Sequence, residues 1–184
     1  MSRAVPDIVA FRLGDAGRFP NNPTLPVLVY RQIVPGEFAT SESIASWFEK
    51  TWKQHEWTPA WRYGVYDFPH YHSTAHEVLG VYRGDASLRI GDRSGCTVEA
   101  RAGDMLVLPA GTAHQNLGAS SDFHVVGGYP SGQTANLLRG RDGERPAADE
   151  IIAHVPLPVR DPIFGDSGPL VVHWGLQSPG RPGG

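Results

Sequence analysis

Residues 63–84 read YGVYDFPHYHSTAHEVLGVYRG, and residues 103–114 read GDMLVLPAGTAH. In both stretches, short runs rich in Val, Leu and aromatic residues are separated by turns that contain Gly or Pro. Between them, residues 86–90 and 96–100 alternate apolar and polar side chains on either side of the turn GDRSG, which is typical of an antiparallel hairpin with one buried face. Runs of this kind continue to Pro130 and predict an all-β domain, either a β-sandwich or a small closed barrel.

The same stretches carry side chains suited to binding a metal ion. His70 and His72 lie at the end of a strand predicted over residues 62–72, and their spacing of two directs both imidazoles to the same side of the sheet. Glu77 opens the next predicted strand, and His114 ends the second stretch after a tight turn. If the sheets fold back on each other, these side chains converge and form a site for a divalent metal ion.

The two stretches resemble the two motifs of the cupin superfamily. The first motif is Gly, five residues, His-x-His, three or four residues, Glu, six residues and Gly, and it is matched by Gly64, His70, His72, Glu77 and Gly84. The second is Gly, five residues, Pro-x-Gly, two residues and His, and it is matched by Gly103, Pro109, Gly111 and His114. The usual second motif ends with Asn three residues beyond its His, and Leu117 occupies that position here.

The resemblance implies an antiparallel β-barrel or jelly roll, with an N-terminal helix and few short helical segments. It also implies a mononuclear metal held by His70, His72, Glu77 and His114. Imidazole and carboxylate ligands without thiolate suit a divalent transition metal such as Fe, Mn, Ni or Zn. Four protein ligands in an octahedral shell leave two positions, which suits a chelating substrate or a substrate together with dioxygen.

These expectations favour a metal-dependent small-molecule enzyme of the non-haem dioxygenase type, with Tyr66 and Phe68 as pocket walls. One alternative is a cupin that binds a metal and a small ligand without catalysis, and another is a metal-dependent sugar isomerase. His124 is the candidate acid or base near the metal, although a hydrogen-bonded core histidine is the favoured interpretation of this residue. Alternation along the strand directs His76 away from Glu77, so His76 is not expected to be a ligand.

The chain divides into four predicted parts. Residues 1–54 form an N-terminal extension with edge strands and a helix over residues 40–57, whose first turn Thr40 or Ser41 can cap. The barrel core, the segment that follows it and the tail are expected at residues 55–130, 131–177 and 178–184, respectively. The segment after the core is predicted to be irregular, as a mobile lid or a surface excursion, and then to add C-terminal strands. The tail is predicted to be disordered.

Composition restricts the partners of this 184-residue chain. A formal net charge of -3, with basic residues spread along the sequence, argues against nucleic-acid binding. Cys96 is the only cysteine, which fits a reducing cytoplasm, and no apolar stretch approaches the roughly 20 residues that span a bilayer. We therefore expect a cytoplasmic protein with a small-molecule substrate or ligand and no membrane partner. The cupin resemblance implies a homodimer, for which residues 1–36 are suited to cross onto the partner.

Overall fold

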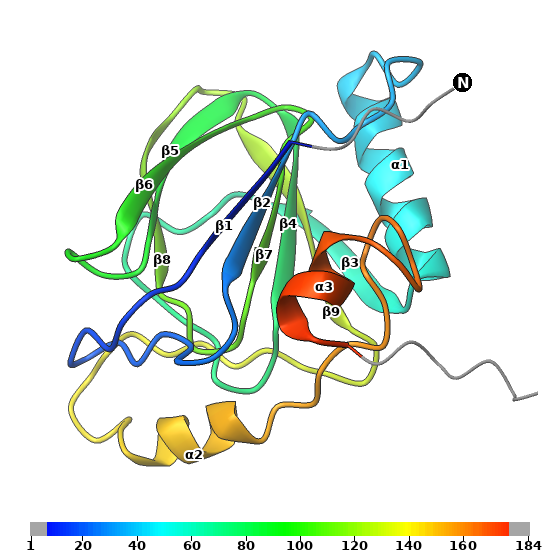
Figure 1. Ribbon diagram of the computed structural model, residues 1–184. Helices are drawn as coiled ribbons and strands as arrows, with labels where there is room; N and C mark the ends of the chain where they lie inside the picture. Colours follow the sequence, from blue (N-terminus) through cyan, green and yellow to red (C-terminus); the bar gives the residue numbers. More distant parts are fainter. Residues whose placement is uncertain (1–6, 177–184) are drawn as a thin grey trace, which may run out of the picture.

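The structure is a computed structural model that describes residues 7–176. Within these residues, Figure 1 shows two antiparallel sheets, one long helix and two short ones. The large sheet has the strand order β1 (Asp7–Phe11), β2 (Val27–Arg31), β7 (Met105–Leu108), β4 (Glu77–Arg83), β9 (His124–Pro130) and β3 (Trp57–Tyr63). The small sheet has the order β6 (Cys96–Arg101), β5 (Asp85–Ile90) and β8 (His114–Ala119). The predicted all-β class with few short helices is confirmed.

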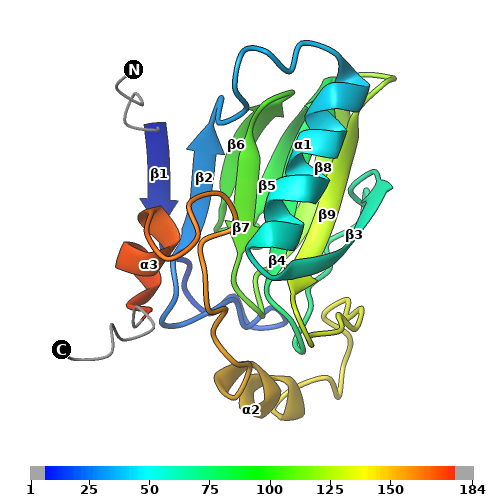
Figure 2. The ribbon, with the colours of Figure 1, turned by 90° about the vertical axis from the view of Figure 1, so that its right-hand side faces the viewer.

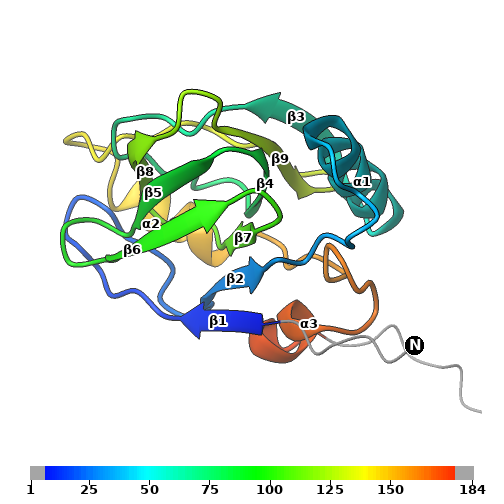
Figure 3. The ribbon, with the colours of Figure 1, turned by 90° about the horizontal axis from the view of Figure 1, so that it is seen from above.

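The two sheets face each other and enclose a core of aliphatic side chains (Figure 3). Leu79 and Leu106 of the large sheet and Leu88 of the small one are all buried there. The chain crosses between the sheets at Gly84, which joins β4 to β5 with a φ of +69°. Within residues 7–176 the strands of one sheet form no ladder with those of the other. Of the two predicted architectures, the described residues therefore show the sandwich of two sheets and not the closed barrel.

Helix α1 (Ser41–Gln54) covers the outer face of the large sheet (Figure 2). Thr40 is its N-cap: the Thr40 hydroxyl accepts a hydrogen bond from the Ser43 backbone at 3.1 Å, and the Ser43 hydroxyl accepts one from the Thr40 backbone at 3.0 Å. Phe48 and Trp52 lie on the buried face of this helix, in one core cluster with residues of the large sheet. The helix is shorter than predicted because the chain turns at Glu56, where φ is +65°, before β3 begins. No helix within residues 7–176 is long and apolar enough to cross a membrane.

The chain on either side of the predicted core differs from expectation in two ways. At the N-terminal side only β1 is an edge strand, because β2 pairs with both β1 and β7 inside the large sheet. At the C-terminal side the predicted strands are wrong, since up to Leu176 the structure has helices α2 (Ala147–Ala153) and α3 (Pro169–Trp174). The tail predicted over residues 178–184 lies outside the described residues. The predicted domain boundaries remain predictions.

The strand predicted over residues 62–72 is also shorter than expected. It corresponds to the end of β3, which stops at Tyr63, and the chain then loops to His70. Pro69 has no N–H to donate to a ladder, so a continuous strand through this segment is disfavoured. His70 instead forms an isolated antiparallel bridge with His114 at the start of β8, through backbone hydrogen bonds of 3.1 and 2.9 Å. This bridge, rather than strand alternation, brings the first motif to the second.

Candidate metal centre

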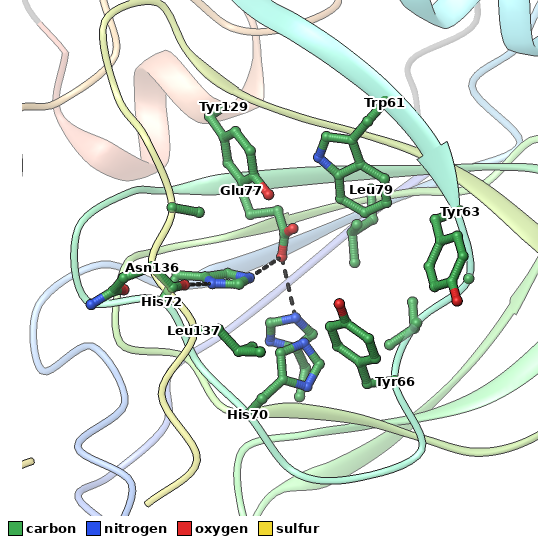
Figure 4. A pocket seen from close by; sticks show the side chains of 14 residues that line it. Trp61, Tyr63, Tyr66, His70, His72, Glu77, Leu79, Tyr129, Asn136 and Leu137 are labelled. Carbon is green, nitrogen blue, oxygen red and sulfur yellow. Dashed lines mark hydrogen bonds and ion pairs between the residues drawn. The ribbon is translucent and has the colours of Figure 1, made fainter.

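Three histidines from the two motifs meet at one point. Figure 4 shows two of them, His70 and His72, near Glu77. One ring nitrogen from each of His70, His72 and His114 lies within 4.8 Å of the others. His70 and His114 are buried, and the side chain of His72 is 11% exposed. The ring centroids of His70 and His114 are 4.0 Å apart. These three side chains could therefore hold one metal ion.

Each of the three rings places Nδ1 against a backbone carbonyl oxygen. The pairs are His70 with Phe68 at 3.0 Å, His114 with Thr112 at 3.0 Å, and His72 with Asn136. A carbonyl oxygen only accepts hydrogen bonds, so Nδ1 carries the hydrogen in each ring. In a neutral ring Nε2 then presents its lone pair, which is the arrangement that metal-binding histidines need.

Glu77 completes the cluster from the first position of β4. Its Oε2 lies 3.2 Å from Nε2 of His114 and 3.5 Å from Nε2 of His72, and the residue is 2% exposed. Oε2 is buried without a well-formed hydrogen bond to any residue in 7–176. A carboxylate oxygen that faces two imidazole lone pairs at these distances is repelled unless a cation lies among them. The buried donor set of three imidazoles and one carboxylate thus fits a divalent transition metal.

The protonation of the cluster follows from burial and from its neighbours. Burial, followed by the nearby His114, lowers the pKa of His70 to about 3, so His70 is neutral in ordinary buffers. Burial alone would raise the pKa of Glu77, but His72 and His114 outweigh it and hold that pKa well below its usual range. Burial would lower the pKa of His72, but the Glu77 carboxylate outweighs it and raises that pKa. Either a proton on His72 or a metal ion can balance the Glu77 charge.

The turn after β7 places the last ligand. Glu77 pairs with Leu108 at the end of β7, and the chain then turns through residues 109–113 to His114. Gly111 makes this turn possible with a φ of +92°, and its N–H donates to the carbonyl of His72 at 2.8 Å. One short turn therefore brings ligands from both motifs to one point.

A cavity of about 330 Å³ adjoins the cluster. Its walls are mainly aromatic and aliphatic: Trp61, Tyr63, Gly64, Val65, Tyr66, His70, His72, Glu77, Leu79, His114, Tyr129, Ala135, Asn136 and Leu137. Tyr66 is among the residues that line the cavity. Phe68 is outside the lining described for residues 7–176, and it stacks on Tyr66 with ring centroids 4.8 Å apart. Phe68 therefore supports the wall instead of forming it.

His124 does not reach this site. It begins β9 opposite Arg83, and its Nδ1 lies 3.1 Å from Nη2 of that arginine. Tyr129, five residues or roughly 17 Å further along the strand, is the β9 side chain that lines the cavity. His124 also has the parity of Val126, which packs in the core beneath α1, whereas Val125 packs between the sheets. The prediction of an acid or base near the metal at this position is therefore wrong.

His76 is buried away from the ligand cluster. Its Nδ1 accepts a hydrogen bond from the backbone N–H of Ala110 at 2.9 Å, and its ring packs on Trp174 with centroids 4.8 Å apart. Its ring nitrogens are outside the metal-binding group found among residues 7–176. The structure places His76 in a packing role between the turn after β7 and helix α3.

Sequence reasoning missed a segment that crosses the cavity, residues 133–138, which we call the strap. Asn136 anchors it: Oδ1 accepts from the Ser73 backbone at 2.8 Å, and Nδ2 donates to the Ser73 hydroxyl at 2.8 Å. Thr74 donates to the carbonyl of Thr134 at 2.7 Å and accepts from the Asn136 backbone at 2.9 Å. The strap also supplies the carbonyl that orients His72. It is a fixed part of the site, held to the loop that carries two ligands, and not the free lid that we considered.

Asn136→Ala is expected to lower the free energy of unfolding by about 1–3 kcal/mol, because the buried Ser73 backbone N–H and hydroxyl lose their partners. It should also weaken Zn²⁺ binding roughly tenfold, since the carbonyl that orients His72 is no longer held in place. Urea unfolding and a Zn²⁺ titration measure the two effects. Gln32→Ala is the control, because the Gln32 side chain bonds to the Ala102 carbonyl and to Asp104, away from the ligand cluster. Equal losses of Zn²⁺ affinity in both variants would contradict this role.

Comparison with known proteins gives one full-length relative. No protein-family model matches the chain. The uncharacterized protein YjlB of Bacillus subtilis (strain 168) is 36% identical over 160 residues, which is 87% of this chain and 92% of that protein. That protein's name gives no activity.

The similarities to solved structures are weaker. Acireductone dioxygenase from Bacillus anthracis, with a cadmium ion in its active centre, is 14% identical with a TM-score of 0.35, over 67% of this chain and 77% of that one. A double-stranded β-helix protein from Klebsiella pneumoniae is 14% identical with a TM-score of 0.32, over 76% and 84%. The 11S allergen of Cocos nucifera is 25% identical with a TM-score of 0.36, over 50% of this chain and 30% of that one. TM-scores this low assign no activity.

The family follows from the two motifs, their geometry and the full-length relative together. All nine motif positions are present in order. The fold brings the histidines and the glutamate of both motifs to one buried point between two antiparallel sheets. The chain belongs to the same family as YjlB, and its two motifs match those of the cupin superfamily.

Proposed function

We propose that the protein holds one divalent transition metal ion, Fe, Mn, Ni or Zn, through His70, His72, Glu77 and His114. The observation that carries this proposal is the orientation of the donors. Three carbonyl oxygens hold Nδ1 of the histidines, and Nε2 of His72 and of His114 lies 3.5 and 3.2 Å from a buried carboxylate oxygen that has no well-formed hydrogen bond among residues 7–176. The adjoining cavity of about 330 Å³ is at the small end of the range for ligand pockets. The metal and a small molecule would therefore meet at one place.

The reaction class that we propose is that of a non-haem dioxygenase. A bound redox-active metal would supply activation of dioxygen and polarisation of a coordinated substrate oxygen. Dioxygen is the oxidant in this class, and both of its atoms enter the product. The chain itself contributes apolar walls, including Trp61 and the buried Leu79. Glu77 contributes the negative charge that keeps a cation at the cluster.

The structure bears differently on the two alternative functions, non-catalytic ligand binding and sugar isomerisation. Non-catalytic binding of a small ligand uses the same metal and the same walls. A sugar isomerase needs a group that moves a proton beside the substrate, and His124, the candidate from the sequence, lies elsewhere on β9. The geometry therefore supports the isomerase least.

Elemental analysis of protein purified without chelators tests the site. We expect about one equivalent of metal in the wild type and near-complete loss after His70→Ala or His114→Ala, since each change removes a ligand from the closed cluster. His154→Ala is the control, because that exposed histidine bonds to the Glu150 carbonyl and lies outside the ligand cluster. Full metal content in both ligand variants would overturn the assignment.

Oxygen uptake tests the reaction. Protein loaded anaerobically with Fe²⁺ is exposed to dioxygen with a panel of small diols and diketones, and substrate-dependent uptake is expected for at least one of them. The His114→Ala variant serves as the blank because it should lack metal. An absence of uptake at full metal occupancy would reject the dioxygenase and favour the binding protein.

A further inference from the structure

The charge of the cavity restricts the ligand. Among the described residues, the cavity lining holds neither Lys nor Arg. Arg139 follows the strap, but its guanidinium lies 3.7 Å from the ring centroid of Phe68, behind the wall. The one carboxylate of the lining, Glu77, already faces His72 and His114. A phosphate or an ammonium group on the ligand body would therefore find no partner in this lining, so it would be costly to bury unless it stayed at the solvent-exposed side formed by Tyr63, Tyr66 and Leu137.

The walls are flat and held in place by their neighbours. Phe68 stacks on Tyr66 at an interplanar angle of 17°, and His70 meets the same ring edge-on with centroids 5.1 Å apart. Trp61 lies directly against Gly127 of β9, so closely that a Cβ at Gly127 would overlap the indole. Such fixed rings favour a planar partner, because aromatic groups gain most from stacked or edge-on contact.

Two neutral donors sit at the Glu77 side of the cavity (Figure 4). The buried indole N–H of Trp61 faces the Tyr129 hydroxyl, although it forms no well-formed hydrogen bond to the part of the chain that the structure describes. Burial, followed by the charge of Glu77, raises the pKa of Tyr129, so its phenol keeps its proton. A ligand oxygen placed here would be met by hydrogen-bond donors.

We infer that the cavity takes a small planar molecule with an uncharged body and two adjacent oxygen atoms, and that Tyr129 donates a hydrogen bond to one of them. The inference rests on the proposed metal site, because four protein ligands in an octahedral shell leave two positions for a chelating oxygen pair. The simplest member of this class is 1,2-dihydroxybenzene. Sugar phosphates are disfavoured, because the lining formed by the described residues offers the phosphate no Lys or Arg.

Isothermal titration calorimetry of the zinc-loaded full chain tests the ligand class. Zinc has no redox chemistry, so binding is measured without turnover. We expect 1,2-dihydroxybenzene to bind at one equivalent. Its isomer 1,3-dihydroxybenzene, whose oxygens cannot both reach one metal, should bind at least tenfold more weakly. Ribose 5-phosphate should give no binding heat.

Matched variants test the role of Tyr129. Tyr129→Phe is expected to lower the affinity for 1,2-dihydroxybenzene about tenfold, which is the usual effect of losing one hydrogen bond to an ionised or metal-bound oxygen. Trp61→Phe is the second variant, and a similar loss is expected. Tyr82→Phe is the control, because Tyr82 is buried in the core beneath α1 and outside the lining formed by the described residues. Thermal unfolding and zinc content are recorded for each variant.

The outcomes separate the two proposals. A wild-type protein that retains no zinc overturns the metal site and this inference with it. Full zinc content with equal binding of the two dihydroxybenzenes, or with binding of ribose 5-phosphate, overturns the ligand class and leaves the metal site standing. Equal affinity of Tyr129→Phe and Tyr82→Phe for 1,2-dihydroxybenzene overturns the assignment of Tyr129.

Discussion

Glu77→Gln is expected to lower the affinity for Zn²⁺ by about 100- to 1,000-fold while the protein stays folded. Gln has nearly the same shape, so the change removes the negative charge and keeps the packing. The carboxylate faces His72 and His114 at 3.5 and 3.2 Å. An ion pair at about 4 Å and an effective dielectric constant of ~20 is worth about 4 kcal/mol, and each ~1.4 kcal/mol is a factor of ten. Zn²⁺ titration against a competing chelator measures the loss.

A second buried carboxylate provides the control. Asp104 is 1% exposed, pairs with Arg31 at 2.9 Å and accepts hydrogen bonds from Gln32, away from the ligand cluster. Asp104→Asn should lower the free energy of unfolding by about 1–3 kcal/mol, because its partners lose a charged acceptor, and leave Zn²⁺ affinity unchanged. Wild-type Zn²⁺ affinity in Glu77→Gln would remove Glu77 from the ligand set.

The hairpin of the small sheet could be predicted in register from the sequence. Residues 86–90 and 96–100 alternate strictly, and β5 pairs with β6 so that Ala86 faces Ala100 and Leu88 faces Val98. Alternation is informative here because one face of these strands is buried and the other is exposed. The motif histidines and Glu77 could likewise be assigned to one place, since their spacing reflects a turn geometry that the structure reproduces.

The position of His124 could not be predicted in the same way. Strand β9 is buried on both faces, with α1 beneath one and the small sheet above the other. Its sequence HVVGGYP therefore has no polar side that marks the outside. The two parities are equivalent in the sequence, and only tertiary packing sends Tyr129 into the cavity and His124 to Arg83.

The strap was unpredictable for a different reason. Its link to the site joins Asn136 to His72 and Ser73, more than sixty residues earlier. The side-chain amide of Asn136 binds Ser73, whereas the backbone carbonyl of Asn136 binds the ring of His72. No local periodicity encodes where an irregular segment rests, because its hydrogen bonds go to other parts of the chain instead of along a strand or helix. The choice between a sandwich and a closed barrel could not be made from the sequence for a similar reason, since closure depends on pairing between edge strands that are distant in the chain.

Gly111→Ala is expected to lower the free energy of unfolding by about 3–5 kcal/mol. Part of the loss, about 1–2 kcal/mol, is the cost of an L side chain at a φ of +92°. The rest comes from crowding, because the new Cβ would lie 2.6 Å from the Asn21 carbonyl oxygen and 2.8 Å from Ile152. Since the Gly111 N–H also donates to the His72 carbonyl, movement of this turn shifts ligands of both motifs, so Zn²⁺ affinity should fall as well.

Gly132→Ala separates the two contributions to the effect of Gly111→Ala, the cost of the backbone conformation and the crowding around the new Cβ. Gly132 has a similar φ of +86°, and within the described chain nothing lies within 4 Å of a Cβ built there. Gly132→Ala should therefore cost only the backbone part, about 1–2 kcal/mol, and leave Zn²⁺ binding intact. Urea unfolding of the metal-free proteins gives the difference between the two variants. Equal destabilisation would mean that the turn after β7 moves freely past Asn21, and a turn that moves so freely could not hold His114 in place.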